Sequence, residues 1–299
     1  MSPITERTSD AIGADIFENC RPFLFGLAYR LLGTRAEAED AVQETYLKWQ
    51  AADAATLDNP RAWLTSVCTR HCLDLLRSAQ RRRVEYVGTW LPEPIHPSEE
   101  SSPEAEAELS SSLSMAFLLL LERLAPKERA AYLLHEVFAL SYSEIAQILG
   151  TNEAACRKLV SRACNSIGRE RTGHAPSRER QLLLLDAFRN AITGGELEPL
   201  AQLLAQEVTL RADGGGKVPT LRETLLGRAA VLGFVAESLR TYWQGYEWRE
   251  TDLNGARGVV LRDEAQTTAA VSFSWNAQGE VDGIYIVRNP DKLSRLALS

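Results

Sequence analysis

The sequence predicts a multidomain protein in which two all-α helical domains precede an α+β domain. Three observations indicate this organisation. Helix start and stop signals recur between residues 16 and 166. A stretch rich in Pro, Ser and Glu interrupts these helices at residues 84–107, as expected of an extended linker. After residue 178 the pattern changes to helices followed by strand-like runs, and turn residues lie between these runs.

The composition is that of an ordinary globular chain. Of its 299 residues 45% are hydrophobic and 24% are charged, and this length predicts two domains or more. No apolar run is long enough to span a membrane, and the first residues lack the apolar core of a secretory signal. We therefore expect a cytoplasmic protein without a membrane partner.

The net charge of −7 conceals a local separation of charge. Arginines dominate residues 61–83, where Asp74 is the one acid. Residues 84–122 carry many glutamates and neither Lys nor Arg. A basic block beside an acidic one indicates local electrostatic roles and argues against a surface that binds nucleic acid all over.

The first two helices are predicted from their ends. Residues 16–32 are helical and stop at Gly33. Thr34 and Glu37 have the spacing of a capping box, which opens a second helix through about Gln50. One face of the second helix is polar and acidic and includes a leucine: Asp40, Gln43, Glu44 and Leu47. Such a face suits a protein partner, although a solvated acidic surface with one stray leucine has the same pattern.

Asn59 and Pro60 open a third helix that ends in a run of arginines. We expect its apolar face to contain Leu64, Val67, Cys68, His71 and Leu75. We expect its basic face to contain Ser66, Thr69, Arg70, Leu73 and Arg77, with Arg81, Arg82 and Arg83 at the end. Cations and hydroxyls on one face suit phosphate and base contacts, and an ordinary charged surface helix is the alternative.

The linker contains an unusual apolar stretch, Trp90-Leu91-Pro92-Glu93-Pro94. Large apolar side chains in a solvated linker usually have a docking surface. An apolar helix over residues 109–124 follows the linker.

Residues 126–166 contain three helical segments with little between them. Pro126 suits a first helical position. Ser141 and Glu144 form another capping box, and Gly150 ends that helix in the left-handed conformation. Thr151 or Asn152 then caps the last helix.

The last of these helices has one apolar and one basic face. At about 100° per residue the apolar face contains Ala155, Cys156, Leu159, Val160 and Ala163. The outer face contains Ala154, Arg157, Lys158, Ser161 and Asn165, with Arg162 beside them. A helix, a glycine turn and a basic amphipathic helix are typical of a DNA-reading helix-turn-helix, although any short helical hairpin with a charged face has this pattern.

The C-terminal part reads as an α+β domain of about 120 residues. Helices are expected at 182–192, 197–204 and 228–242, with a strand at 208–212. An antiparallel meander follows, with strands near 245–253, 256–262, 266–275 and 280–288. Asn254-Gly255 between the first two is a strong hairpin signal.

The five cysteines are odd in number and lack disulfide spacing, so we expect buried thiols that act as small apolar residues. Cys68, His71 and Cys72 lie about one helical turn apart, but no second pair of ligands is close in sequence. Neither a metal nor a cofactor is therefore expected.

Three segments together resemble the two DNA-binding domains of an extracytoplasmic-function (ECF) sigma factor. They read GTRAEAEDAVQETYLKW, NPRAWLTSVCTRHCLDLLRSAQRR and LAPKERAAYLLHEVFALSYSEIAQILGTNEAACRKLVSRA. WLPEP, DGGGK and NPDKL resemble the signatures of a subgroup with a fused SnoaL-like, ketosteroid-isomerase-like cone. The resemblance implies sigma region 2 at 10–83, a linker at 84–108, a region 4 helix-turn-helix at 109–168, a linker at 169–177 and the SnoaL-like domain at 178–299.

The resemblance also implies the partners, which are core RNA polymerase and promoter DNA. The face with Asp40, Gln43, Glu44 and Leu47 would dock on the β′ clamp helices of the polymerase. The third helix, with Ser66, Arg70, Arg77, Arg81 and Arg82, would engage the minus-ten element. The last helix, with Ala154, Arg157, Lys158, Ser161 and Arg162, would lie in the major groove of the minus-thirty-five element.

In that subgroup the C-terminal domain regulates the chain in cis. We expect the residues of these three signatures to be the interdomain regulatory site: Trp90, Leu91, Pro92, Asp213, Gly214, Gly215, Gly216, Lys217, Asn289, Pro290 and Asp291. A domain that grips the linker would shift the populated spacings of the two DNA-reading domains. The glycine run allows close approach of a backbone, so it could receive the linker or a small-molecule ligand, or be an ordinary glycine loop.

We expect the C-terminal domain to bind rather than to catalyse. All four histidines precede residue 178, and Asp213 is a candidate base only by its residue type, beside glycines that argue against a rigid site. No nucleotide-binding or nucleophile motif is present. Two alternatives stay open: a one-component ligand-sensing DNA-binding regulator, and an isomerase or hydrolase with a DNA-binding appendage.

Overall fold

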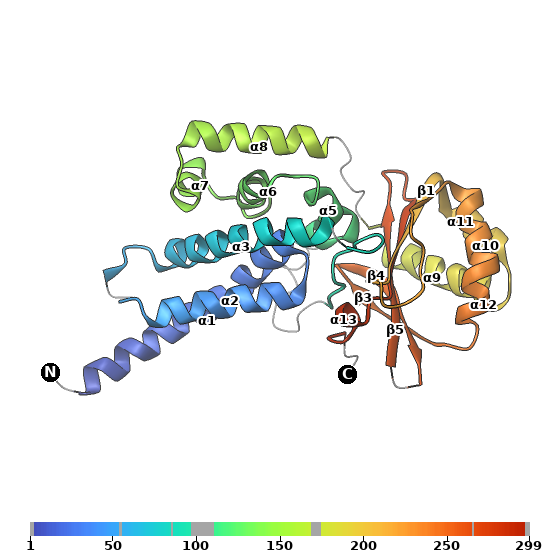
Figure 1. The fold of residues 1–299 in the computed structure, drawn as a ribbon, viewed down its shortest axis with the longest axis horizontal. Helices are drawn as coiled ribbons and strands as arrows, with labels where there is room; N and C mark the ends of the chain where they lie inside the picture. Colours follow the sequence, from blue (N-terminus) through green and yellow to red (C-terminus); the bar gives the residue numbers. More distant parts are fainter. Residues whose placement is uncertain are drawn as a thin grey trace. The chain divides into compact units, whose positions relative to one another are not determined.

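A computed structural model describes residues 3–53, 56–84, 86–96, 111–168, 175–264 and 266–296 (Figure 1), without the side chains of 3–12, 79–84 and 111. The chain forms two compact units. The helical unit contains Met1–Arg82 and Leu120–Arg169, and the sheet unit contains Arg83–Leu119 and Glu170–Ser299. A segment of the sheet unit therefore lies, along the chain, between the two halves of the helical unit.

The helical unit is built as the capping signals predict. Its elements are α1 (Pro3–Leu32), α2 (Arg35–Gln50), α3 (Pro60–Val84), α6 (Pro126–Tyr132), the π-turn η3 (Leu133–Val137), α7 (Tyr142–Leu149) and α8 (Glu153–Ile167). The hydroxyl of Thr34 accepts from the N–H of Glu37 at 3.3 Å, so Thr34 caps α2 as predicted. Gly150 ends α7 with φ 62°, and Asn152 rather than Thr151 caps α8.

Before residue 125, two helices have other boundaries than expected. Helix α1 begins at Pro3, well before the expected residue 16. The apolar helix expected over 109–124 is shorter: a single turn, η2 (Ser111–Leu113), precedes α5 (Met115–Leu121). The hydroxyl of Ser114 accepts from the N–H of Phe117 at 3.2 Å, so a serine caps α5 and sets its start.

The expected face assignment of α3 was wrong in part. Its buried face is centred on Leu64, Cys68, Cys72 and Leu76, each 0% exposed, and it also includes Thr69 and Leu73. Thr69 and Leu73 therefore belong to the core and not to the basic face, while His71 and Leu75 are only half-buried. The buried face of α3 is wider than the narrow apolar stripe that side-chain type alone suggests. Residues at the edge of that face were therefore assigned to the exposed side.

The sheet unit is α+β, as predicted. Its elements are α9 (Arg178–Thr193), α10 (Leu197–Leu203), β1 (Leu204–Asp213), β2 (Leu225–Leu226), α11 (Arg228–Phe234), η4 (Val235–Leu239), α12 (Arg240–Trp243), β3 (Glu247–Leu253), β4 (Ala256–Asp263), β5 (Gln266–Trp275), β6 (Val281–Val287) and α13 (Pro290–Leu293). The strand order is β2-β1-β6-β5-β4-β3. The meander β3–β6 is antiparallel as expected, but β1 pairs with β6 in parallel, so the sheet is mixed.

Both faces of this sheet are apolar. Helices α9 to α12 cover one face, and their core includes Phe188, Trp243 and Phe273 (Figure 1). The other face carries a second cluster with Leu91, Met115, Leu253, Tyr285, Leu293 and Leu296. Leu91 comes from the linker, so the linker supplies part of the cover that the second face needs.

Three further features bear on function. Among the described residues no helix is long and apolar enough to cross a membrane, and no three His, Cys, Asp or Glu side chains gather as metal ligands. Four of the five cysteines are buried as expected. Cys164 is exposed on α8, which corrects the expectation for that thiol.

Candidate functional site

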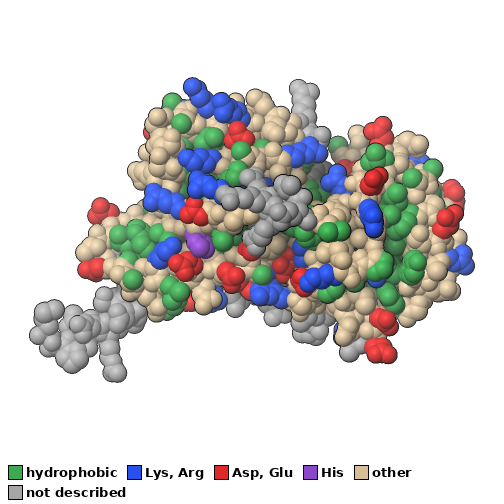
Figure 2. Space-filling model, in the orientation of Figure 1, with side chains coloured by type: hydrophobic (Ala, Val, Ile, Leu, Met, Phe, Trp, Pro, Cys, Tyr) green, Lys and Arg blue, Asp and Glu red, His purple; other side chains and the backbone are tan. Residues whose placement is uncertain are grey.

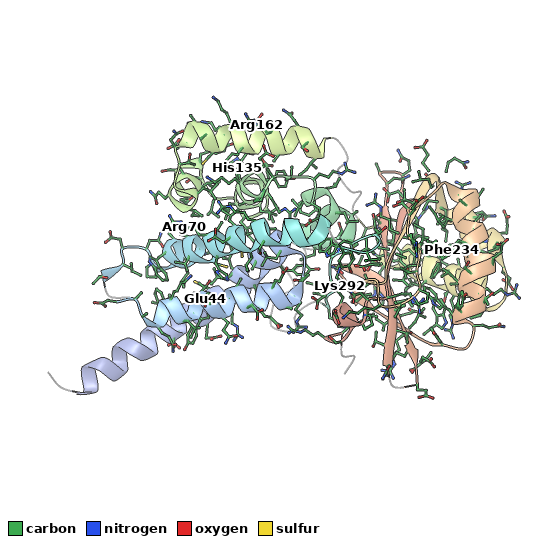
Figure 3. The ribbon with its side chains drawn as sticks, viewed as in Figure 1. Glu44, Arg70, His135, Arg162, Phe234 and Lys292 are labelled. Carbon is green, nitrogen blue, oxygen red and sulfur yellow. The ribbon has the colours of Figure 1, made fainter. Side chains whose placement is uncertain are left out.

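The acidic face of α2 is solvent-accessible. Asp40 and Gln43 are exposed and Glu44, labelled in Figure 3, is half-buried. Leu47 is 52% exposed, an unusually high value for a leucine that lies in a folded helix. Glu44 forms an exposed ion pair with Lys48 at 3.4 Å. The side chains predicted for this face therefore share one accessible surface.

The outer face of α8 is accessible as well. Ala154, Arg157, Lys158, Ser161 and Arg162 are all exposed. In Figure 2 Lys and Arg side chains gather along the upper edge of the molecule, over α8. The Arg157 guanidinium pairs with Glu153 at 3.1 Å and lies 5.2 Å from the ring centroid of Tyr142 on α7. Arg157 thus contacts both its own helix and α7.

The basic side chains of α3 have different surroundings. Arg70, predicted to contact DNA, donates to the carbonyl oxygens of Ile148 and Gln147 at 3.0 and 3.2 Å, at the C-terminal end of α7. Arg77 pairs with Asp74 at 2.8 Å, and both are exposed. Ser66 is half-buried. The predicted side chains of Arg81 and Arg82 lie outside what the structure describes.

Residues 86–96 of the linker pack on the sheet unit. Residues 91–95 are buried, and Leu91 is 0% exposed. Trp90 is half-buried beside them. The expected docking surface for the apolar stretch is therefore the face of the sheet that the helices leave uncovered. The remainder of the predicted linker, residues 97–108, lies outside the described residues.

Asp213, at the end of β1, is the centre of this contact. Its carboxylate is 0% exposed, and both oxygens accept hydrogen bonds. One oxygen accepts from the hydroxyl of Tyr86 at 2.6 Å and from the N–H of Gly215 at 2.9 Å. The other accepts from the N–H of Leu91 at 3.0 Å and from the ammonium of Lys292 at 2.7 Å. A buried carboxylate is stable only with such a complete set of partners.

Lys292 joins Asp213 to the linker. Its ammonium also donates to the carbonyl oxygen of Leu91. It lies 4.5 Å from the ring centroid of Trp90 and 5.3 Å from that of Tyr86. Lys292, labelled in Figure 3, belongs to α13 (Pro290–Leu293). The main-chain N–H and C=O of Leu91 are thus bound by an anion and a cation that also bind each other.

Tyr86 completes the network. Its hydroxyl accepts from the side-chain amide of Asn289 at 2.9 Å and donates to Asp213. Burial, and then the hydrogen bond to Asp213, raise the pKa of Tyr86 well above its ordinary value. The phenol therefore keeps its proton, which the bond to the carboxylate requires.

The glycine run after Asp213 lies against the linker and α13. Gly215 and Gly216 have φ angles of 63° and 69°, which favour glycine. A Cβ on Gly216 would lie 3.0 Å from the side chain of Val87 in the linker, and one on Gly215 would lie 2.5 Å from Asn289. The run therefore permits a close approach that other residues would block. Gly214 is buried.

DGGGK and NPDKL also meet at the surface. Lys217 pairs with Asp291 at 2.6 Å, with both side chains more than half exposed. Pro290 is exposed beside them. Of the predicted linker site, Trp90, Leu91, Asp213, Gly215, Gly216 and Asn289 lie close together around the buried ion pair, and Lys217 and Asp291 lie at its rim.

Sequence reasoning missed several contact residues. Tyr86 and Lys292 bind Asp213, and Asn254, in the turn between β3 and β4, exchanges two hydrogen bonds with Ile95 of the linker. Lys292 stands inside NPDKL, so the motif pointed to it, but a lysine is normally expected in solvent. Asn254 was recognised only as a turn residue. Nothing in its sequence context indicates that the turn is covered.

Comparison with known proteins covers both units. Residues 16–82 match the family model of Sigma-70 region 2, and residues 114–167 match that of Sigma-70, region 4. ECF RNA polymerase sigma factor SigJ of Mycobacterium tuberculosis is 35% identical over 293 residues, covering 93% of this chain and 92% of that protein. The probable ECF RNA polymerase sigma factor SigI of the same species is 31% identical over 246 residues, covering 73% and 83%. The crystal structure of SigJ superposes with a TM-score of 0.73 and 32% identity, over 94% of this chain and 98% of that one.

Proposed function

The chain belongs to the extracytoplasmic-function RNA polymerase sigma factors, and we propose that its SnoaL-like C-terminal domain regulates it in cis by holding the linker between regions 2 and 4. As a sigma factor it directs RNA polymerase to specific promoters, where transcription starts. One observation carries the proposal: the main chain of Leu91 is bound by the buried pair of Asp213 and Lys292.

The physical basis is a shift of populations. Two DNA-reading regions on a free linker have many relative placements, and few of these match one promoter. Contacts to Leu91, Tyr86 and Trp90 restrict the linker, so they favour some placements over others by the free energy of docking. Whatever opens or closes these contacts changes promoter use. The sign of the effect depends on which placement the promoter requires.

Trp90→Ala and Asp213→Asn test this role. Trp90→Ala removes the ring that faces Lys292, and Asp213→Asn removes the charge that pairs with it. Both variants are expected to increase amide hydrogen exchange at Leu91 about tenfold or more and to change transcription by reconstituted holoenzyme. Tyr242→Ala, which truncates an exposed aromatic on α12, is the control. Faster exchange with unaltered transcription would mean that the docking has no regulatory role.

We propose that the domain acts by binding and has no catalytic role. Asp213 was the candidate base, and a base needs a free lone pair that faces a substrate. Both of its oxygens instead accept hydrogen bonds from the linker, the glycine run and Lys292. Conversion of a panel of cyclic ketones by the wild-type chain, lost in Asp213→Ala, would contradict this.

We further propose that α2 binds core polymerase and that α3 and α8 contact the two promoter elements. The accessible acidic face around Leu47 and the accessible basic face of α8 support these roles. On α3, the hydrogen bonds from Arg70 to the carbonyl oxygens of α7 have to open before the Arg70 side chain can reach DNA.

Leu47→Ala tests the polymerase role. An apolar anchor in an interface centre contributes about 2 kcal/mol, so its truncation is expected to raise the Kd for core polymerase by roughly 30-fold. Leu183→Ala on α9 is the matched control, because Leu183 is 56% exposed and Leu47 is 52% exposed. Affinity is measured by fluorescence anisotropy with labelled chain. Equal affinities for both variants would remove α2 as the docking face.

A further inference from the structure

Region 4 contains three side chains in contact, one each from η3, α7 and α8. The ring of His135, labelled in Figure 3, lies against the ring of Tyr142, with the two centroids 4.2 Å apart and the planes inclined by 30°. The guanidinium of Arg157 lies 5.2 Å from the centroid of the same tyrosine ring. The ring of Tyr142 therefore links the turn before α7 to the helix after it.

Hydrogen bonds fix the surroundings of this ring. Nδ1 of His135 lies 3.0 Å from the carbonyl oxygen of Leu140, so this nitrogen carries the proton and the bond orients the imidazole. Tyr142 is the first residue of α7, and the capping box of Ser141 and Glu144 sets the start of that helix. The ring thus lies on a helix end whose position is well defined.

The turn between η3 and α7 is strained. Ala139 has a φ angle of 54°, a conformation that residues with a Cβ rarely adopt. Directly before it, the N–H of Phe138 donates to the carbonyl oxygen of Leu133 at 3.0 Å. Strain of this kind persists only where the surrounding structure determines it, and it is frequent at functional sites. In this turn it accompanies the contact of Leu140 with His135.

Arg157 has a second partner in its own helix. Its guanidinium lies 3.1 Å from the carboxylate of Glu153, one turn earlier, and the two side chains are 56% and 47% exposed. Partners on two helices restrict a long side chain that otherwise has many rotamers. A side chain that is restricted before binding loses less conformational entropy when it binds. Arg157 therefore combines access to solvent with a restricted orientation.

We propose that Tyr142 is a positioning residue, which orients Arg157 toward one base pair of the minus-thirty-five element. The proposal rests on the contact between α8 and that element proposed above. Arg157 is the fifth residue of α8, and the N-terminal part of a recognition helix contacts base edges. A guanine edge accepts two N–H groups of an arginine in a fixed geometry. The ring of Tyr142 therefore contributes to base preference through Arg157, without a DNA contact of its own.

Substitutions at Tyr142 and Arg157 test this in the full chain. Tyr142→Leu removes the ring and keeps an apolar side chain, and Tyr142→Met fills the same space if leucine leaves a cavity. Tyr142→Phe keeps the ring and removes the hydroxyl. Arg157→Gln removes the guanidinium. Tyr242→Leu, which truncates an exposed tyrosine on α12, is the control.

The measured quantity is the discrimination between base pairs. The Kd of reconstituted holoenzyme is determined for a promoter that the wild-type chain selects and for each single base-pair change in its minus-thirty-five element. The position at which the wild type discriminates and Arg157→Gln does not is the Arg157 position. Amide protection in α7 and α8 shows that each variant is folded.

Tyr142→Leu and Tyr142→Met are expected to lower the discrimination at the Arg157 position roughly two- to fivefold, the factor that an exposed cation–π contact supplies. Discrimination at the other positions stays the same, and Tyr142→Phe behaves as the wild type. In the Arg157→Gln background Tyr142→Leu has no further effect, because the ring then has no guanidinium to orient. In the free chain, ¹⁵N relaxation should show a more mobile Arg157 Nε–H in Tyr142→Leu and not in Tyr142→Phe.

Four results would overturn the proposal. Discrimination at the Arg157 position is unchanged without the ring, or it falls equally at every position, as expected of a general loss of structure. Tyr142→Phe loses as much as Tyr142→Leu, which would mean that the hydroxyl acts. The effect of Tyr142→Leu persists in the Arg157→Gln background.

Arg157→Gln separates this proposal from the one on which it rests. If Arg157→Gln abolishes discrimination at one position and Tyr142→Leu changes it at none, the DNA contact of α8 stands and the positioning role fails. If Arg157→Gln changes discrimination at no position, the base contact of Arg157 fails and the positioning role fails with it.

Discussion

Asp213 and Lys292 form an ion pair with side chains 0% and 8% exposed, and both also bind the main chain of Leu91. The cost of moving two charges out of water is large, so such a pair is stable only while every partner is present. Lys217 and Asp291, a few residues away on the same two loops, form an ion pair in solvent. Both pairs join a lysine to an aspartate, but one is buried and the other is exposed. Comparing them therefore isolates the effect of burial on stability.

Lys292→Met is expected to destabilise the sheet unit by about 3 kcal/mol, because it leaves the carboxylate of Asp213 buried without a cation. Lys217→Met is the matched control, and its expected cost is below about 1 kcal/mol, since exposed pairs contribute little. Urea unfolding followed by amide exchange in β1 and β6 measures both. If both substitutions lower the free energy of unfolding equally, the burial of Lys292 does not determine how much its ion pair stabilises the fold.

At the scale of elements, the capping boxes determine where the helices of region 4 begin. The N–H of Ser141 donates to the carboxylate of Glu144 at 2.8 Å, and the hydroxyl of Ser141 accepts from the N–H of Glu144 at 3.3 Å. Helix α7 ends at Gly150, and α8 starts three residues later. The position of α8 thus depends on a short helix with well-defined ends.

Ser141→Ala is expected to destabilise the helix-turn-helix by about 1 kcal/mol, and Ser143→Ala, exposed on the same helix, by almost nothing. The hydroxyl and then the N–H of Ser141 lower the pKa of Glu144 below its ordinary 4.5. The capping contribution is therefore complete above pH 4.5 and lost as pH falls through the lowered pKa. Thermal unfolding between pH 3 and 7 should show a smaller pH dependence in Ser141→Ala than in the wild type.

Local signals predicted most elements, and contacts between distant residues explain the rest. Caps at Thr34, Ser141 and Gly150 act over four residues, so the sequence displays them. The parallel pairing of β1 with β6 and the strand β2 of only two residues leave no periodic pattern. The roles of Tyr86 and Lys292 arise because the linker lies on the sheet. Side-chain type places a lysine in solvent, so its burial could not be predicted.

At the scale of the whole molecule, one segment joins the proposed regulatory domain to the two sigma regions. Arg83–Leu119 belongs to the sheet unit although it joins the two halves of the helical unit. Regions 2 and 4 are thus continuous with a chain that the C-terminal domain holds. If the linker contacts open when the holoenzyme binds a promoter, the free energy of opening them reduces the observed promoter affinity.

The salt dependence of promoter binding tests the DNA contacts within this assembly. Each cation that neutralises a phosphate contributes about 0.9 to the slope of log K against log salt, so Lys158→Gln should reduce the slope by about that amount on every sequence. Arg157→Gln should instead relax the preference at one base pair by about 1–3 kcal/mol. Holoenzyme binding is measured across potassium chloride concentrations. Arg189→Gln, an exposed cation on α9, is the control, and a Lys158→Gln slope equal to it would rule out that phosphate contact.

The linker is recognised at Leu91 and Ile95 through N–H and C=O groups that nearly every amino acid has, and the residues next to them, Pro92 and Pro94, have no N–H to offer. Replacing a side chain in this stretch leaves the donors where they are. Inserting or deleting a single residue moves a proline into the place of a donor and puts all later groups out of phase with Asn254. The stretch should therefore be more sensitive to a change of length than to a conservative substitution of one side chain.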